Sequence, residues 1–416
     1  HTKWILLCIL AAVSIQAIVG LCQLILSHWV TIPYFDPDIH RAFGLFRQPN
    51  VMASFMATGL IVSCFLLANH NVEKTRRRHL YHIWLYLLIF ATTLLIATSF
   101  SRTGQLGAAV GWLLLTPYLW KKSPKQLLKI TCAIAIALSV GSQILHLNKS
   151  IANPKPYANT QVREDIYLIT FSMIKENPIT GVGYGGFQRQ YLEQASQLRN
   201  VPESQQIASL PDLDHPHNEV LYWIAEGGIA PTIGFIVFVC AFGLLLIPLT
   251  WPMKLAACAF IFPILLHTQT EIPFYSSLSH WVTFICLISI SAHWSGTRTY
   301  NFSMKKVGAA TLCLAIITPI FSTLFLLTTL HTGHIVTQYE QSKNIPITSF
   351  NKIINPLPWL SRIEANIYAN ILVTSLKQQD EAKLRRYVEW AEKRVAYAPR
   401  KSLFNNMVFA LGILQD

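Results

Sequence analysis

The sequence predicts an all-α fold, built as a polytopic bundle of transmembrane helices. Of its 416 residues, 52% are hydrophobic and 13% are charged, whereas about a quarter of the residues in a soluble domain are charged. The mean hydropathy of the chain is +0.39. Its apolar runs suit helices that cross a bilayer, and they do not alternate in segments of about ten residues, which excludes a transmembrane barrel.

Nine apolar runs are candidate membrane spans. A helix needs roughly 20 apolar residues to cross the hydrocarbon, and the runs 105–120, 255–270 and 281–294 are shorter than that. The first run begins within four residues of His1 with no small-residue cleavage site after it, so we expect a span rather than a signal peptide, and earlier spans missing from this sequence. The nine runs are 4–27, 51–69, 80–98, 105–120, 126–145, 219–248, 255–270, 281–294 and 307–330.

Basic residues fall in alternate loops, which sets the expected orientation. Loops on the cytoplasmic side of a membrane are enriched in Lys and Arg. We therefore place the basic loops of this chain, and its N-terminus, in the cytoplasm. Their basic residues are Lys74, Arg76, Arg77, Arg78, Lys121, Lys122, Lys125, Lys254, Arg298, Lys305 and Lys306. The segments expected outside are 28–50, 99–104, 146–218, 271–280 and 331–416. The net charge of +13 is partly this signal, and because no basic face is interleaved with aromatic residues, we expect no nucleic-acid partner.

The two large outer segments differ in character. Segment 146–218 is polar and rich in proline, with one helix predicted over 162–175. The tail is predicted to hold amphipathic helices at 363–377 and 381–396 and a third nearer the C-terminus. Such helices resemble tetratricopeptide units, and a plain helical cap is the alternative. The expected domains are therefore a membrane domain, 1–330, which contains the loop 146–218, and a helical tail, 331–416.

Arginine residues in the outward segments are candidates to bind phosphate. The planar guanidinium group of arginine presents paired N–H donors that match the oxygens of phosphate esters. A pocket of arginines therefore suits a diphosphate on an isoprenoid carrier. One arginine at a span boundary is usually a snorkelling anchor. Arginines and histidines gathered at one depth near hydrocarbon are costly, and they are usually functional. The candidates are Arg41, Arg47, Arg102 and Arg163, in outward polar segments that also include 215–219, 267–273 and His280.

His217 is the candidate general base, because histidine titrates near neutral pH. A structural or helix-capping histidine is the alternative. The catalytic interpretation is favoured because Asn218 and Glu219 follow directly, where they can orient the ring. His215 lies two residues earlier, but its position before a proline biases it towards an extended backbone.

Two other patterns suggest different chemistry. The glycines of residues 181–186 match the dinucleotide-binding fingerprint, but no strand precedes them, so we expect a tightly turning loop. Asp36 with Asp38, and Asp212 with Asp214, have the spacing used by metal-dependent glycosyltransferases. Hard cations need more oxygen ligands than these pairs supply, so a divalent metal is the lesser alternative.

Five motifs follow one another over residues 40–285. They are Arg-x-Phe-Gly-x-x-x-Gln-Pro-Asn at 41–50, Ser-Arg-Thr-Gly at 101–104, Arg163 through Asn177-Pro-Ile-Thr-Gly-Val-Gly-Tyr-Gly-Gly-Phe187, His215-Pro-His-Asn-Glu-x-Leu-x-Trp-x-x-Glu-Gly-Gly228, and His267-x-x-x-Glu-x-Pro-Phe with Ser279-His280-Trp281. Together they resemble the bacterial protein O-oligosaccharyltransferases of the PglL type, members of the O-antigen ligase superfamily. The last motif resembles the PglL branch in particular.

The resemblance implies en bloc transfer of a glycan from undecaprenyl diphosphate to a serine or threonine of a periplasmic or pilin protein. It implies no metal or other cofactor, and an active site on the periplasmic face of the inner membrane. Carried onto this chain, Arg102 and Arg163 bind the diphosphate and His217 is the catalytic histidine. Arg41 and Arg47 are the further candidates to bind the diphosphate. The residues expected to support the site are Gln48, His215, Asn218, Glu219, Glu271 and His280.

Two alternative functions are left open at this point. An O-antigen ligase or polymerase of the same superfamily would use the same donor site but pass the glycan to lipid A core or to another lipid-linked glycan. A transporter would carry ionisable groups near the bilayer midplane, where these spans have almost none.

Overall fold

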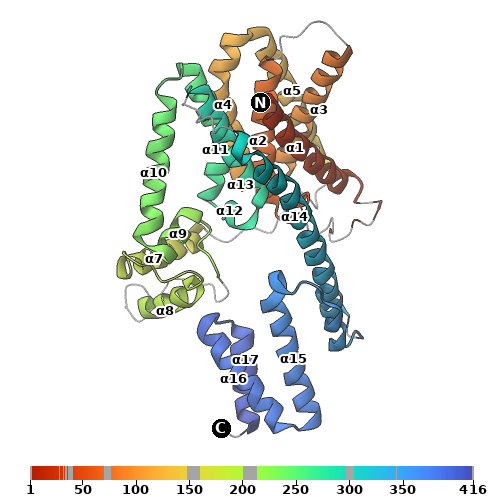
Figure 1. Cartoon of the computed structure of the whole chain (residues 1–416), viewed down its shortest axis with the longest axis vertical. Helices are drawn as coiled ribbons and strands as arrows, with labels where there is room; N and C mark the ends of the chain where they lie inside the picture. The colour runs from red at the N-terminus through yellow and green to blue at the C-terminus, as the bar shows by residue number, and fades with distance from the viewer. Residues whose placement is uncertain are drawn as a thin grey trace. The chain divides into compact units, whose positions relative to one another are not determined.

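The computed structural model describes residues 2–27, 29–30, 32, 35, 41–69, 76–147, 160–199, 213–296, 304–342 and 344–414. Within these ranges every regular element is a helix, so the predicted all-α fold is confirmed. The described residues up to Gly296 form one compact unit, and those from Met304 onward form a second (Figure 1).

The first unit is a bundle of apolar helices around α2. The apolar part of α2 is 94% buried, and α2 packs against α1, α3, α4 and α11. A Cβ atom at Gly104 would lie 2.4 Å from the Ala53 Cβ, so the glycine of the Ser-Arg-Thr-Gly motif permits the close approach of α4 to α2. The bundle helices are α1 (Thr2–Ile25), α2 (Pro49–Asn69), α3 (Arg76–Thr98), α4 (Arg102–Lys122), α5 (Pro124–Leu147), α10 (Ile229–Leu246), α11 (Trp251–Thr268) and α13 (Leu278–Trp294).

Seven described helices are long and apolar enough to cross a membrane, which supports a multi-pass protein. They are α1, α2, α5, α10 and α11, with α3 from His79 and α14 from Thr311. Two further expected spans correspond to α4, which is less apolar, and to α13, which has 17 residues. The span expected at 219–248 is wrong as one helix. Gly228 has a φ of 63°, and this left-handed backbone ends α9 (Glu219–Gly227) before α10 begins.

A small helical subdomain comprises α7 (Thr160–Glu176), α8 (Phe187–Arg199) and α9. The helix predicted at 162–175 is confirmed as α7, whereas α8 was not predicted. Their shared core contains Ile169, Phe187, Tyr191 and Tyr222. The glycine-rich segment between α7 and α8 is a loop, as predicted, and it packs on the end of α9, where Glu226 accepts the Gly185 backbone N–H over 2.9 Å.

The second unit begins with the 38-residue helix α14 (Met304–Gln341). The 3₁₀ helices η2 (Ile347–Lys352) and η3 (Leu357–Trp359) follow, and then α15 (Leu360–Gln378), α16 (Glu381–Tyr397) and α17 (Lys401–Leu414). The three tail helices were predicted, and they pack around Leu384, Tyr387 and Ala391. The domain boundary expected after residue 330 falls inside α14, so that division of the chain stays a prediction.

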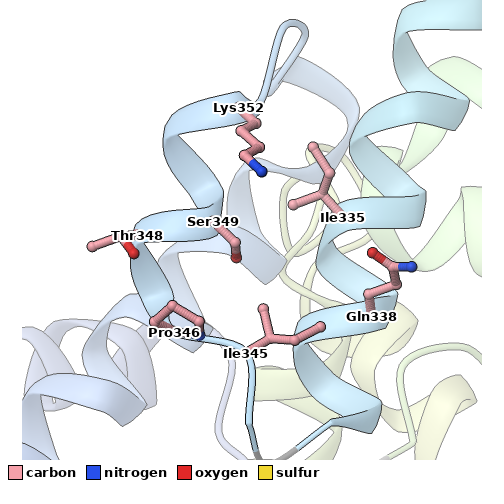
Figure 2. Close-up of a pocket in the computed structure, with 7 residues that line it drawn as sticks. All are labelled: Ile335, Gln338, Ile345, Pro346, Thr348, Ser349 and Lys352. Carbon is pink, nitrogen blue, oxygen red and sulfur yellow. The ribbon is translucent and has the colours of Figure 1, made fainter.

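The second unit also contains a cavity of about 370 Å³ between α14 and η2. Figure 2 shows Gln338 of α14 across the cavity from Ser349 of η2. The cavity is lined by Ile335, Gln338, Ile345, Pro346, Thr348, Ser349 and Lys352. None of the predicted site residues lines it, so it is separate from the site described next.

Candidate functional site

The turn of residues 269–272, between α11 and α12 (Pro273–Ser276), brings distant motifs together. The hydroxyl of Thr103, in the first turn of α4, donates to the hydroxyl of Thr270 over 3.0 Å. The Tyr167 hydroxyl of α7 donates to the Gln269 carbonyl over 3.4 Å. The partners are 167 and 102 residues apart in the sequence. We call residues 269–272 the hub turn.

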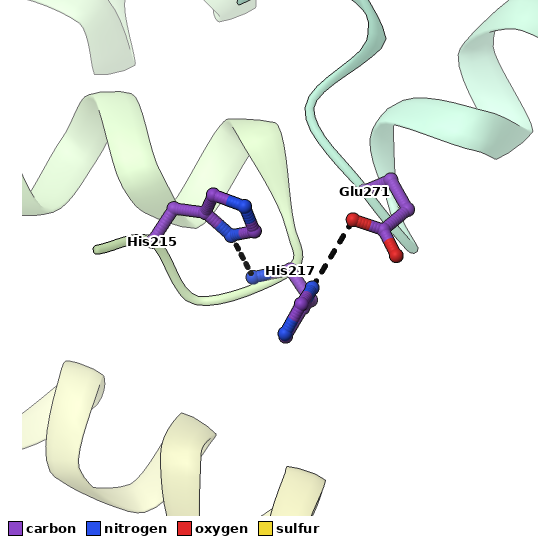
Figure 3. Close-up of side chains that lie close together, drawn as sticks. All are labelled: His215, His217 and Glu271. Carbon is purple, nitrogen blue, oxygen red and sulfur yellow. Dashed lines mark hydrogen bonds and ion pairs between the residues drawn. The ribbon is translucent and has the colours of Figure 1, made fainter. Parts of the chain in front are cut away.

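His217 is paired with Glu271 of the hub turn. The His217 Nδ1 lies 3.1 Å from the Glu271 Oε2 (Figure 3). The His217 side chain is 30% exposed and that of Glu271 is 11% exposed. Burial alone would raise the pKa of Glu271, but the hydrogen bond and positive charge of His217 outweigh it and hold this pKa below its usual value. An ionised carboxylate accepts the Nδ1 proton, which leaves the Nε2 lone pair of the neutral ring available as a base.

His215 supports the backbone of His217. Its Nδ1 accepts the His217 backbone N–H over 3.2 Å, and the two rings meet edge to face with centroids 4.6 Å apart. Burial and the positive charge of His217 lower the pKa of His215. His217 itself has a φ of 51°, a left-handed backbone that is uncommon outside glycine and is often found at functional sites.

Asn218 and Glu219 were expected to orient the His217 ring, and the hydrogen bonds of their side chains run elsewhere in the structure. The Asn218 side-chain oxygen Oδ1 caps α9 by accepting the Leu221 N–H over 3.0 Å. Its amide donates to the Gln269 carbonyl over 3.3 Å. The buried Glu219 accepts the backbone N–H groups of Phe274 and Tyr275. Both residues therefore fasten α9 to the hub turn and α12.

Glu219 is buried, and its environment is unusual for a carboxyl group. Burial raises its pKa to about 7, although the two backbone N–H groups oppose the shift. The Glu219 carboxyl group is therefore easier to protonate than an ordinary glutamate.

Arg102 and Arg163 lie next to the contacts that reach the hub turn. Arg102 is the first residue of α4 and directly precedes Thr103, and Arg163 lies one helical turn before Tyr167 on α7. Both side chains are exposed. Within the described ranges, neither guanidinium has a hydrogen bond or an ion pair with another residue. Both forks are thus available to an anionic ligand.

The segment that carries Arg41, Arg47 and Gln48 is held by α1. The buried Gln23 side chain accepts the backbone N–H groups of Phe43 and Gly44. Arg41 is half-buried and donates to the Ser99 carbonyl over 2.7 Å. This contact gives Arg41 a structural role that the sequence analysis did not expect.

Arg47 and Gln48 lie at the start of α2. Arg47 is exposed and has a φ of 57°. The Gln48 carbonyl accepts the Met52 N–H over 3.1 Å, which is the first hydrogen bond of α2. Both residues therefore lie on the segment 41–48. The hydrogen bond of Arg41 to Ser99 attaches this segment to the loop before α4.

His280 was expected near the site surface and is instead buried in the bundle. Its Nε2 lies 3.0 Å from the Ser54 hydroxyl, which also lies 2.8 Å from the His267 Nδ1. The Ser277 hydroxyl lies 2.9 Å from the His280 Nδ1. Ser54, His267 and His280 are fully buried, with no surface accessible to solvent. We call these three residues the buried histidine cluster; it joins α2, α11 and α13.

A metal ion has one possible binding place in the described part of the chain. His215, His217 and Glu271 each present a ligand atom, and these atoms lie within 4.8 Å of one another. Three ligands of this type suit a transition metal. Asp36, Asp38 and Asp212 lie outside the described residues, and Asp214 is exposed.

Several residues that build the site were not singled out from the sequence. Thr103 belongs to the Ser-Arg-Thr-Gly motif and Tyr167 is a common residue type on a helix, but only the fold brings them to the hub turn. Ser54 lies in an apolar run and resembles any small residue of a packed helix. The His267-x-x-x-Glu271 spacing was a usable signal, since it places both side chains near one end of a helix.

Comparison with known families gives three matches. Residues 86–239 match the family described as O-Antigen ligase, residues 42–67 match Protein glycosylation ligase, and residues 255–416 match Virulence factor membrane-bound polymerase, C-terminal. No curated protein matches the chain. The first match contains Arg102, Arg163 and His217, and the third contains Glu271. Together these matches support the superfamily of O-antigen ligases and PglL-type protein glycosylation ligases, and they indicate a glycosyl-transferring enzyme.

Proposed function

We propose that this protein transfers a preassembled glycan from undecaprenyl diphosphate to a serine or threonine of a periplasmic or pilin protein. The observation that carries the proposal is the His217–Glu271 pair at the hub turn, to which α4 and α7 bring their arginines. The match of residues 42–67 to protein glycosylation ligases supports a protein acceptor. The proposed site faces the periplasm from the inner membrane.

In the proposed reaction His217 is the general base. A seryl or threonyl hydroxyl is a weak nucleophile at neutral pH, so a base must take its proton during attack. The hydroxyl oxygen bonds to the anomeric carbon, and the proton passes to the His217 Nε2. Glu271 holds the opposite nitrogen and stabilises the imidazolium that forms. A single displacement inverts the anomeric configuration.

Arg102 and Arg163 stabilise the leaving group. The bond between the anomeric carbon and the diphosphate oxygen breaks, and its electron pair stays on the diphosphate. A diphosphate needs charge stabilisation more than protonation, and two guanidinium groups in a partly dehydrated site supply it. The mechanism therefore needs no metal ion, and the carrier stays in the lipid.

The second candidate is an O-antigen ligase, which is equally compatible with the family matches. The O-Antigen ligase match covers both arginines and His217, so the donor half of the mechanism is shared. The two functions differ in the acceptor alone, which is lipid A core for the ligase.

Co-expression separates the two candidates. The protein is expressed with a lipid-linked glycan pathway, a candidate pilin and an intact lipid A core. Intact-mass analysis of the pilin, with gel analysis of the lipopolysaccharide, identifies the acceptor. A pilin heavier by one complete glycan supports the proposal. Glycan found on lipid A core alone would establish the ligase.

A further inference from the structure

Large apolar side chains are exposed on the α7–α9 subdomain, outside the membrane-spanning helices. On α7, Leu168 is 57% exposed and Phe171 is 54% exposed. In the following loop, Ile179 is 71% exposed and Tyr184 is 67% exposed. We call these four residues the α7 surface. A group of exposed apolar residues on a folded domain usually marks an interaction site.

The loop half of this surface is fixed at the first turn of α10. The Ile229 N–H, the first of α10, donates to the Ile179 carbonyl over 3.1 Å. A Cβ atom at Gly227 would lie 2.9 Å from both the Tyr184 hydroxyl oxygen and the Pro231 ring. Ile179 and Tyr184 therefore lie at the depth where α10 begins.

α10 exposes apolar side chains along its whole length, while Phe238 and Phe242 pack against the bundle. None of its apolar window is buried in the protein, and Ile229, Ile233 and Ile236 are exposed. The exposed apolar surface of the loop thus continues directly into surface that contacts lipid. A residue at this level lies at the boundary between hydrocarbon and headgroups.

The helix half of the surface is the face of α7 opposite its core. The core side of α7 carries Ile166, Ile169 and Met173, which pack with Phe187 of α8 and Tyr222 of α9. Along the axis of α10, Figure 1 shows α8 further from α10 than α7 is. Leu168 and Phe171 lie on the other side of α7 and are exposed.

We infer that the α7 surface seats in the headgroup region of the bilayer, with α7 lying in the membrane plane beside α10. Leu168, Phe171 and Ile179 enter the acyl boundary, which is the behaviour of interfacial amphipathic helices. Tyr184 stacks edge to face on Trp223 at 6.0 Å, and such aromatic side chains favour the membrane interface. The partner is the lipid bilayer.

The charged residues of α7 agree with this placement. Lys175 lies on the same face as Leu168 and Phe171, at a spacing of seven and four residues, and its ammonium can reach anionic headgroups while its stem stays in the interface. Arg163 lies on the flank of this face. Where the proposed function holds, membrane seating sets the Arg163 guanidinium at the depth of lipid phosphates, and thus of the carrier diphosphate.

Photocrosslinking in a bilayer tests the placement. The full chain is reconstituted in nanodiscs of phosphatidylethanolamine and phosphatidylglycerol, with benzoylphenylalanine at Phe171, at Ile179 or at Arg189. Arg189 of α8 is the matched control, since its side chain is 59% exposed on the helix further from α10. After irradiation, intact mass reports lipid adducts. We expect yields on the order of tenfold higher at Phe171 and Ile179, because only residues sunk several Å into the interface meet acyl chains.

The possible results separate clearly. Equal lipid adducts at Phe171, Ile179 and Arg189 would overturn the inference. Adducts at Ile179 without Phe171 would overturn the placement of α7, and crosslinks from both positions to another protein would favour a protein partner in place of lipid. The assay needs no glycan transfer, so its failure leaves the proposed function untouched. Likewise, lipid adducts in an enzyme that transfers no glycan would refute the proposed function alone.

Discussion

Two groups of histidines lie near the hub turn and differ in their access to solvent. His215 and His217 are partly exposed on the loop before α9, and Glu271 holds His217 by one nitrogen. His267 and His280 are fully buried, and the Ser54 hydroxyl bridges them. A substrate can reach the first group, whereas the second contacts only protein within the described residues.

This difference in access suits His217 to act as a base and the buried histidine cluster to hold helices in place. A base needs one ring nitrogen oriented by a partner and the other open to the acceptor, which is the condition of His217. In the buried histidine cluster, Ser54 occupies one nitrogen of each ring and no substrate can approach. His267 nevertheless lies in the last turn of α11, and its carbonyl accepts the Glu271 N–H over 3.0 Å, so the buried group positions the end of the helix that leads to the hub turn.

The strongest test of the comparison is removal of His217. His217→Ala should reduce glycan transfer by about 10²- to 10⁴-fold, the usual contribution of a general base. Binding of the lipid-linked donor should persist, since it depends on the arginines. Transfer is measured by intact mass of the acceptor under single-turnover conditions.

His215→Ala is the matched control for this change. It removes an acceptor of one backbone N–H but leaves the His217–Glu271 pair in place, so transfer should weaken and not vanish. If His215→Ala abolishes transfer and His217→Ala does not, His215 is the general base and the assignment to His217 is wrong.

The next largest effect is expected from the arginines. Arg102→Lys and Arg163→Lys keep the positive charge but lose the planar fork. Loss of a charge-assisted hydrogen bond of about 1.5–3 kcal/mol corresponds to roughly 10- to 100-fold in rate. Both variants should fold and insert. Arg189→Lys, in an exposed ion pair on α8, is the control, and near-wild-type transfer in both test variants would remove the arginines from the site.

Glu271→Gln should have a smaller effect of about tenfold on kcat, because the amide oxygen still accepts the Nδ1 proton but no longer stabilises the imidazolium by charge. The pH dependence of stability gives a second measurement. The pKa of Glu271 is lowered in the folded protein, so its contribution to stability is present above pH 4.5 and is lost as the pH falls through the folded pKa. Glu271→Gln should flatten this acid limb in thermal unfolding, and an unchanged limb would argue against the pairing.

The buried histidine cluster should respond through stability. Ser54→Ala leaves a buried nitrogen of both His267 and His280 without its partner, at a cost of about 1–3 kcal/mol for each. Ser63→Ala is the control on the same helix, because the buried Ser63 hydroxyl donates only to the Gly59 carbonyl. Unfolding in detergent measures both. Transfer per folded molecule should change little in either variant, and a loss as large as that of His217→Ala would give the buried cluster a catalytic role.

Sequence reasoning predicted most of the fold because long apolar runs dominate it. The runs at 51–69 and 80–98 became α2 and α3 with similar bounds. It failed at Gly228, where the apolar run continues although the backbone turns left-handed. It also missed α8, whose polar sequence has little of the hydrophobic signal on which span prediction depends.

The site was only partly predictable for a different reason. Arg102, Arg163 and His217 were singled out because their chemistry is unusual near a membrane. Their partners were not, since Thr103, Tyr167 and Gln269 acquire their role from contacts between segments far apart in the sequence. His280 differs from these residues, because its residue type suggested chemistry whereas the structure buries it in the bundle beside Ser54 of α2.

The smallest expected effect is that of removing metal ions. His215, His217 and Glu271 could in principle hold a cation, but the His215 Nδ1 already accepts a backbone N–H and the His217 Nδ1 is bound to the carboxylate. A metal ion bound there would occupy a nitrogen of the proposed base, and binding through Nδ1 would also break these hydrogen bonds. We therefore expect purified enzyme treated with excess EDTA and then dialysed to transfer glycan at the untreated rate, with no gain from added Mg²⁺ or Mn²⁺. Loss of transfer that either ion restores would make the exposed histidines metal ligands, or would bring Asp36 and Asp38 into the site. His215→Ala separates these cases, because it would weaken the metal dependence only if His215 is a ligand.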